Sequence, residues 1–186
     1  MKKEKEICEF CGKIHEGKHC SYYNEGTNKE IAFVFSCPGN AERDSGYPVS
    51  GPTGEALELL LKKLKNEPIE KINIGDYRCR YDFRITNATT DIESIEVTRK
   101  TEAKNYEVRK EKNIERLSSE IKDFKKIICF GRKAKNVVSI IKLKNVIYVR
   151  HLSPRAFTRK KEVKNTPEGR AGYVYDEIKE QLKENQ

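Results

Sequence analysis

Three short apolar runs place the tightest limit on the fold of this chain. They are IAFVF at residues 31–35, KIICF at 126–130 and NVIYVRH at 145–151. Continuous runs of this length, rich in β-branched and aromatic residues, are typical of strands that are buried on both faces. Such strands form parallel sheets that helices cover on both sides. The sequence therefore predicts an α/β fold, a three-layer α/β/α sandwich around a central parallel sheet.

Apolar residues at helical spacing occupy the intervals between these runs. In TGEALELLLKKLK at 53–65, leucines recur every three or four residues, and Thr53 is a suitable N-cap. Similar spacing predicts helices over 103–124, after the second apolar run as far as about Ile141, and over 173–182. The stretch 66–84 alternates around Gly75, which predicts a strand or a hairpin.

Polar side chains follow the predicted strands at the points where those strands end. Pro38-Gly39 comes just after the first apolar run, Asn87 closes the stretch Ile85-Thr86-Asn87, and His151 ends the third run. Ligands of open α/β sheets bind in the crevice beyond the carboxyl ends of the strands. We expect these residues to border one site.

The charge balance of the chain favours a polyanionic partner. Lys and Arg number 38 against 29 Asp and Glu, which gives a net charge of +9 and a pI near 9.2. A lysine-rich chain with solvated surfaces explains the same numbers. The sequence has no apolar run of membrane-spanning length and no secretory signal, so we expect an intracellular, cytoplasmic and nucleoid-associated protein.

The first 28 residues form a polar Cys/His segment, and we expect residues 29–186 to form the folded domain. The segment has the pattern C-x2-C-x3-H-x4-C, which resembles a retroviral zinc knuckle one residue short. Thiolates and an imidazole at this spacing suit a tetrahedral structural zinc ion, which would order a stretch too polar to fold by burial. The predicted ligands are Cys8, Cys11, His15 and Cys20, with His19 as a substitute for His15. The alternative is a flexible segment without metal.

The stretch SCPGNAERDSGYPVSGPTGEALELL resembles the first motif of the thermostable, iron-sulfur-type branch of the uracil-DNA glycosylases. Three further segments resemble that family in the same order, and together the four span residues 31–155. They are Ile85-Thr86-Asn87, the strand-Gly-x-x-Ala segment at 127–134, and His151-Leu152-Ser153-Pro154. The resemblance implies an enzyme that removes uracil, or a related deaminated base, from DNA in base excision repair.

The resemblance also implies roles for individual residues. Cleavage of the glycosidic bond leaves an anionic base and an oxocarbenium-like sugar, so the site needs a donor, a base-edge reader and an anionic group. His151 would donate to uracil O2, and Asn87 would read the N3–H and O4 edge, which cytosine presents in reverse. Glu42 would position water or stabilise the sugar cation, with Asp44 as a substitute.

A base inside a duplex must be flipped out before it can be cut. Arg155 stands where a relative would insert a wedge residue, and backbone N–H groups around the Pro-Gly loop would bind a base carbonyl. We therefore expect DNA as the partner of a monomeric protein that needs no catalytic cofactor. The expected substrate-binding residues are Cys37, Pro38, Gly39, Asn40, Tyr47, Val49, Ser153, Pro154 and Arg155.

Several positions depart from the family pattern. Ser36 replaces an acidic residue, and Val49 stands where relatives carry the aromatic residue that stacks on uracil, although Tyr47 is two residues away. No Cys follows Asn87 closely, because the chain continues Ala-Thr-Thr-Asp over 88–91, so we expect no iron-sulfur cluster.

Three functional hypotheses follow. The first is a monofunctional DNA N-glycosylase acting on uracil. The second is a nucleic-acid-binding protein that kept the glycosylase scaffold, lost catalytic power and carries a zinc knuckle. The third is an unrelated small-molecule α/β enzyme, which requires that His151 and Asn87 do not converge in space.

Overall fold

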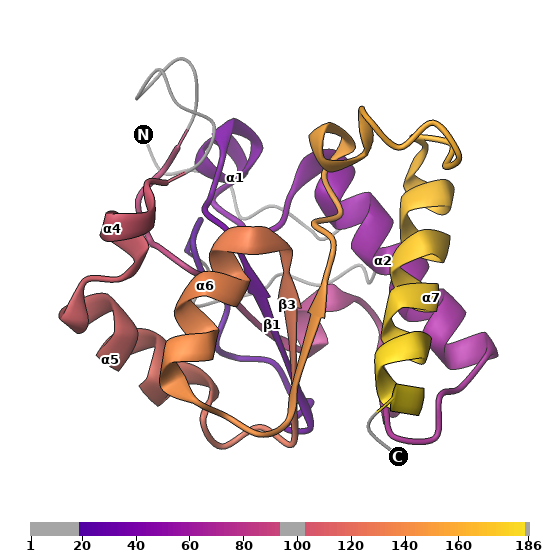
Figure 1. Cartoon of the computed structure of the whole chain (residues 1–186), viewed down its shortest axis with the longest axis horizontal. Helices are drawn as coiled ribbons and strands as arrows, with labels where there is room; N and C mark the ends of the chain where they lie inside the picture. The colour runs from indigo at the N-terminus through magenta and orange to yellow at the C-terminus, as the bar shows by residue number, and fades with distance from the viewer. Residues whose placement is uncertain (1–18, 94–102, 185–186) are drawn as a thin grey trace.

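A parallel four-stranded sheet forms the centre of the molecule (Figure 1). The computed structural model describes residues 19–93 and 103–184. The strands lie in the order β2-β1-β3-β4. Their bounds are β1 Ile31–Phe35, β2 Arg84–Asn87, β3 Lys126–Phe130 and β4 Val146–Val149. The predicted parallel sheet is confirmed.

Strand β1 lies between β2 and β3, and all five of its residues are buried. Its side chains alternate between two separate cores, because successive residues of a strand point to opposite faces. Phe33 and Phe35 belong to one core, and Ala32 and Val34 to the other. A strand that is apolar on both faces therefore marks the middle layer of three.

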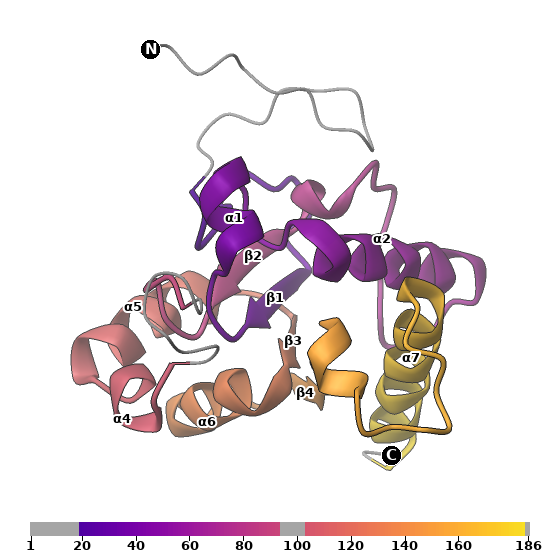
Figure 2. The same ribbon diagram turned by 90° about the horizontal axis from the view of Figure 1, so that it is seen from above.

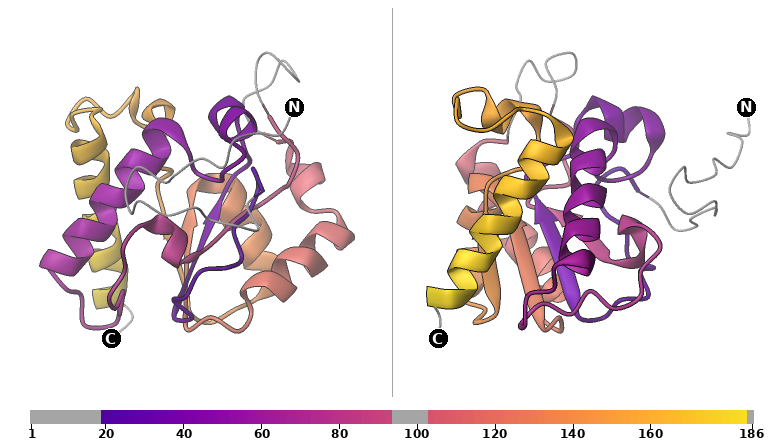
Figure 3. Two further views of the ribbon diagram at one scale, coloured as in Figure 1. Left: turned by 180° about the vertical axis from the view of Figure 1, so that it is seen from behind. Right: turned by 90° about the vertical axis from the view of Figure 1, so that its right-hand side faces the viewer.

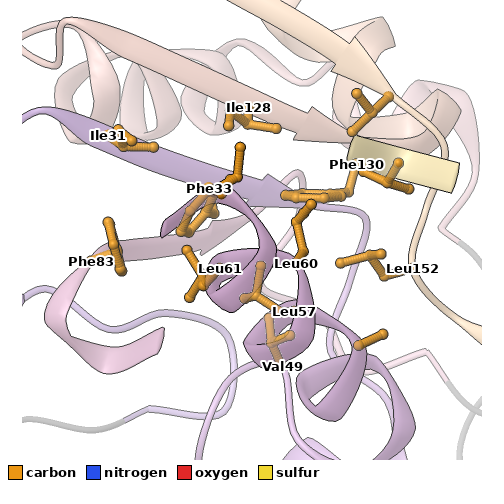
Figure 4. Packing of buried hydrophobic residues seen from close by; sticks show 14 of the residues in the cluster. Ile31, Phe33, Val49, Leu57, Leu60, Leu61, Phe83, Ile128, Phe130 and Leu152 are labelled. Atoms are coloured by element: carbon orange, nitrogen blue, oxygen red, sulfur yellow. The ribbon is translucent and has the colours of Figure 1, made fainter. Parts of the chain in front are cut away.

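Two long helices cover the first face of the sheet. Helix α2 (Gly51–Asn66) and helix α7 (Pro167–Glu184) lie side by side there (Figure 3). The leucines of α2 pack against Phe33 and Phe83, as the close view shows (Figure 4). Helix α7 also covers the edge of the sheet, since the Gln181 carboxamide accepts from the backbone N–H of Tyr148 and donates to its carbonyl.

Three shorter helices cover the opposite face. They are α4 (Asn105–Val108), α5 (Glu111–Ile121) and α6 (Gly131–Ile141), seen across the sheet from α2 in Figure 2. Sequence periodicity predicted one helix over 103–124, and the structure has two. The break has a local cause: the Asn113 side chain donates to the Val108 carbonyl at 2.8 Å, and Lys110 has an extended ψ of 135°.

The strand or hairpin predicted around Gly75 is wrong. The chain there forms turns and a short 3-10 helix, η1 (Arg80–Asp82), before β2 begins at Arg84. Carboxylates take the backbone groups that a ladder would need. Asp82 accepts the N–H of Arg78 at 2.7 Å, and Glu58 accepts the N–H of Arg80 at 2.9 Å.

Three other elements differ from the sequence-based expectation. Helix α2 begins at Gly51 with Ser50 as N-cap, two residues before Thr53, and α7 extends beyond the predicted 173–182 at both ends. A short helix, α1 (Asn40–Ser45), follows the Pro-Gly loop, and a 3-10 helix, η2 (Pro154–Phe157), follows His151. No helix in the described parts of the chain is long and apolar enough to cross a bilayer.

The described end of the N-terminal segment packs on the sheet. Tyr23 forms an isolated antiparallel bridge with Ile85 of β2, with the Tyr23 N–H 2.8 Å from the Ile85 carbonyl oxygen. Of the predicted zinc ligands, Cys8, Cys11 and His15 lie outside the described residues. The domain boundary at residue 28 stays a prediction.

Candidate active site

A pocket of about 490 Å³ opens beyond the carboxyl ends of the strands, where the residues at the strand ends predicted a site. Its size is within the range of small-ligand pockets. Asn87 pairs with Phe35 in the β1–β2 register, so the end of β2 lies beside the Pro-Gly loop. The wall consists of Phe35, Ser36, Cys37, Gly39, Glu42, Val49, Thr53, Asn87, Glu93, His151, Ser153, Arg155 and Ala156. His151 and Asn87 therefore converge, which overturns the third hypothesis.

His151 is neutral and has a defined tautomer. Burial lowers the pKa of its imidazole to about 4. Its Nδ1 accepts the backbone N–H of Ser153 at 3.1 Å, so the ring proton of the neutral form lies on Nε2. The ring meets Phe35 edge to face, with 5.7 Å between centroids. The residue can donate one hydrogen bond without carrying a charge.

Gly131 allows helix α6 to begin against this histidine. Its φ is +87°, a conformation that favours glycine, and a Cβ placed there would lie 3.0 Å from the Cβ of His151. Close packing against His151 thus explains why a glycine occupies this position of the predicted strand-Gly-x-x-Ala segment. A side chain at this position would require His151 to shift.

Arg170 of α7 fixes the loop that carries His151. Its guanidinium is buried and donates from Nε to the Leu152 carbonyl at 2.8 Å and from Nη2 to the Pro52 carbonyl at 3.0 Å. A third bond runs from Nη1 to the Asn165 carbonyl at 3.0 Å. The planar guanidinium therefore joins the histidine loop to the first turn of α2.

Asn87 is buried at the end of β2, and hydrogen bonds hold both its side chain and its backbone. Its Nδ2 donates to the Ser21 carbonyl at 2.8 Å, and Arg116 donates from Nη2 to the backbone carbonyl of Asn87 at 2.9 Å. Ser21 is held in turn, since its hydroxyl donates to the Thr90 carbonyl at 2.8 Å. Nδ2 has two hydrogens, so a second N–H is left for a ligand.

Glu42 joins the two ends of the Pro-Gly loop. Its Oε2 accepts the N–H of Gly39, the N-cap of α1, and its Oε1 accepts the N–H of Ser50, both at 2.9 Å. Burial raises the pKa of its carboxyl, although the two backbone bonds oppose that rise. The carboxylate sets the shape of the wall and adds a negative charge to it. Asp44, its predicted substitute, lies outside the wall and pairs with Arg43 at 2.8 Å.

Val49 lines the pocket in a strained conformation. Its φ is +53°, which a β-branched residue rarely adopts. The next turn explains why the conformation persists, since Ser50 is tied to Glu42 and a Cβ on Gly54 would lie 2.2 Å from the Val49 carbonyl oxygen. Backbone strain held by surrounding contacts is typical of functional sites.

The structure separates the predicted substrate-binding residues into three groups. Cys37, Gly39, Val49, Ser153 and Arg155 are wall residues. The Tyr47 ring instead packs on Tyr81 in the core, with 5.2 Å between centroids. The remaining predicted residues flank wall residues in the chain and are Pro38, Asn40 and Pro154.

Sequence reasoning missed four wall residues. Phe35 was interpreted only as a strand residue and Thr53 only as a helix cap, although both stand near the motifs. Ala156 follows Arg155 directly. Glu93 stands outside every motif, and no pattern indicated that it would be 7% exposed in the pocket wall.

The described residues hold no group of three potential metal ligands. Cys20 and the substitute ligand His19 are among them, and the Sγ of Cys20 lies 4.0 Å from Nδ1 of His19. His19 stacks on Tyr22, and its Nδ1 accepts the N–H of Ser21 at 3.1 Å. Zinc at this segment stays a proposal.

The fold is that of an α/β protein with a parallel sheet covered on both faces. The pocket at the carboxyl edge of the sheet holds a neutral histidine, a buried asparagine and carboxylates, which suit a polar planar ligand. The family model of the uracil DNA glycosylase superfamily matches residues 20–173, well over half of the chain. The protein belongs to that superfamily. No curated protein matched the chain.

Proposed function

We propose that the protein is a DNA N-glycosylase that hydrolyses the glycosidic bond of uracil, or of a related deaminated base, during base excision repair. The observation that carries the proposal is the convergence of a neutral His151, with its proton on Nε2, and Asn87 in one pocket. Membership of the superfamily supports the same reaction class.

In the proposed reaction His151 acts as an electrostatic donor. When the C1′–N1 bond breaks, negative charge spreads onto uracil O2, and Nε2–H donates to that oxygen. Because burial keeps the imidazole neutral, the donor is present at neutral pH without a change of protonation. A fixed donor of this type stabilises a developing anion more than it stabilises the ground state.

Asn87 supplies selectivity in the proposal. With one N–H held by Ser21, the carboxamide keeps one orientation, in which Oδ1 accepts from uracil N3–H and the second N–H donates to O4. Cytosine has an acceptor at N3 and donors at its 4-amino group. Its N3 would therefore face the Oδ1 acceptor of Asn87, and its amino group would face the N–H donor.

The remaining wall residues fit a flipped nucleotide. The Glu42 carboxylate favours positive charge on the sugar, and the Phe35 ring lies in the wall beside His151. Arg155, exposed at the start of η2, can enter the gap that the base leaves.

An excision assay tests the proposal. Oligonucleotides with one uracil, single-stranded or opposite A or G, and matched hypoxanthine and xanthine substrates are incubated with the protein and then treated with alkali. We expect strand scission on at least one of them. The excision rate of His151→Ala, purified in parallel, should be at least 100-fold lower, and this loss would also exclude a contaminating glycosylase. Absence of scission on every substrate would contradict the proposal.

One observation favours a second function, that of a DNA-binding protein with little catalysis. Ser36, which replaces an acidic residue of the family pattern, is buried in the pocket wall, where it brings no charge. This alternative predicts binding that weakens with salt, shows no preference for uracil and yields no abasic product.

A further inference from the structure

A second carboxylate lines the pocket from a segment outside the Pro-Gly loop. Glu93 is 7% exposed and belongs to the same wall as His151, Asn87 and Glu42. Carboxylates are seldom buried this deeply without a role in pairing or chemistry. No motif of the chain includes this residue, and nothing in the proposed reaction has so far used it.

The position of Glu93 is fixed by the backbone. The chain after β2 runs along the end of β1 and the Pro-Gly loop, and three of its N–H groups donate to backbone carbonyls there. Ala88 donates to Phe35 at 2.7 Å, Thr89 to Ser36 at 3.3 Å, and Glu93 to Pro38 at 3.0 Å. This docking holds Glu93 beside the carboxyl end of β1.

The two pocket carboxylates have different surroundings. Each oxygen of Glu42 accepts a backbone N–H, so that side chain is engaged in holding Gly39 and Ser50 together. At the neighbouring end of β1, Ser36 offers a hydroxyl with no charge. Glu93 is a second wall carboxylate, and its backbone N–H donates to the Pro38 carbonyl of the Pro-Gly loop.

We propose that Glu93 is a catalytic residue that binds the hydrolytic water and accepts its proton, an inference that rests on the proposed function. The C1′–N1 bond breaks and its electron pair leaves with the base, whose O2 is held by His151. The water oxygen bonds to C1′, and the proton that it loses passes to the Glu93 carboxylate and then to the departing base. The products are an abasic sugar with a C1′ hydroxyl and the neutral base.

Isosteric substitution is the first test. General-base catalysis contributes about 10²- to 10⁴-fold, so Glu93→Gln should lower the single-turnover excision rate by about 100-fold. The affinity for uracil-containing DNA should change less than threefold, because the shape of the wall is kept. Glu93→Asp, which keeps the carboxylate one methylene further back, should recover part of the rate. Glu70→Gln, an exposed carboxylate beyond α2, is the matched control and should leave the rate unchanged.

Chemical rescue separates catalysis from a structural effect. Glu93→Ala leaves a space in the wall that a small carboxylate can occupy, so sodium formate should raise its excision rate at least tenfold. Sodium chloride at equal ionic strength should not, and formate should not rescue Glu93→Gln, in which the amide fills the space. A merely structural role predicts no formate dependence.

The outcomes distinguish the inference from the proposed function. Excision by Glu93→Gln within threefold of the unmodified protein, or the absence of formate rescue, would overturn the inference and leave the glycosylase assignment standing. If the unmodified protein cuts none of the uracil, hypoxanthine and xanthine substrates, the proposed function fails and the inference fails with it.

Discussion

The carboxamide of Asn87 is oriented by Ser21, because its Nδ2 lies 2.8 Å from the Ser21 carbonyl oxygen. A carbonyl can only accept, so the amide nitrogen and not the oxygen must face it. The contact joins residues 66 positions apart and connects the segment just after Cys20 with the residue that we propose reads the base. Under the proposed function, selectivity would therefore depend on the backbone at Ser21 as well as on β2.

Asn87→Asp should lose both selectivity and stability. A carboxylate has no N–H, so it would face the Ser21 carbonyl with an oxygen and could not donate to uracil O4. We expect excision of uracil to fall at least 100-fold, and the free energy of unfolding to fall by roughly 1–3 kcal/mol, because a buried partner is left unsatisfied. Single-turnover excision and urea unfolding measure the two effects. Excision within tenfold of the unmodified protein would contradict the role given to Asn87.

The depressed pKa of His151 predicts a loss of stability in acid. The folded state binds this proton near pH 4, whereas the unfolded chain binds it near 6.5, so the unfolded state holds more protons between these values. The contribution of neutral His151 is thus complete above pH 6.5 and decreases as the pH falls towards 4, by up to roughly 3 kcal/mol.

The matched variant for that measurement is His151→Gln, which cannot titrate in this range. The difference in unfolding free energy between the two proteins, followed by urea titration from pH 7 to pH 4, removes the contributions of Glu42 and the other carboxyls. A difference that does not change with pH would show that the folded-state pKa of His151 is not depressed.

Gly131→Ala should affect the reaction and the fold together. The added Cβ would lie 3.0 Å from the Cβ of His151, and the residue would keep a φ of +87° that alanine adopts poorly. We expect a loss of roughly 1–2 kcal/mol in stability from the backbone conformation alone. The excision rate should also fall, because the imidazole is displaced from its donor position. Gly172→Ala, where a Cβ would meet open space in α7, is the control and should be neutral or slightly stabilising.

Arg170→Met should loosen the histidine loop. Three backbone carbonyls would lose their donor, and the Leu152 carbonyl, the buried one of the three, would cost about 1–3 kcal/mol if left unsatisfied. Arg170→Lys keeps the charge but cannot make the planar set of bonds, so it should be intermediate. Thermal unfolding and the excision rate check both variants. If Arg170→Lys matched the unmodified protein, the geometry of the guanidinium would not be the important property.

Much of the fold could be predicted because its signals are local. Phe33 and Val34 are apolar neighbours in one short run, and a strand that buries both faces is the simplest solution for such a run. The predictions of secondary structure were wrong where side chains, and not other backbone groups, are the hydrogen-bond partners of the backbone. Asn113 divides the helix expected over 103–124. Asp82 and Glu58 accept backbone N–H groups in the turns where the alternating sequence predicted a strand.

The site was predictable where it depends on motifs at strand ends, and not where it depends on distant contacts. Asn87 ends β2 and His151 follows β4, so the parallel sheet places both at the same edge, where the pocket opens. Hydrogen bonds to backbone groups, which leave no pattern in the sequence, place three further residues at or next to the site: Ser21, Glu93 and Arg170. Tyr47 shows the converse, since its place in the motif suggested stacking on uracil and its ring is buried against Tyr81.

We propose that the N-terminal segment binds one zinc ion through Cys8, Cys11, Cys20 and either His15 or His19. Cys20 directly precedes Ser21, so metal binding there would also restrain the carbonyl that orients Asn87. The purified protein should contain about one zinc per chain by mass spectrometry, since thiolate and imidazole sets of this kind bind zinc tightly. Cys20→Ser should lower the zinc content. Cys129→Ala, at a buried cysteine in β3, is the control and should leave the zinc content unchanged. Zinc-free protein from zinc-supplemented cells would contradict the proposal, and a His15→Ala and His19→Ala pair would identify the histidine ligand.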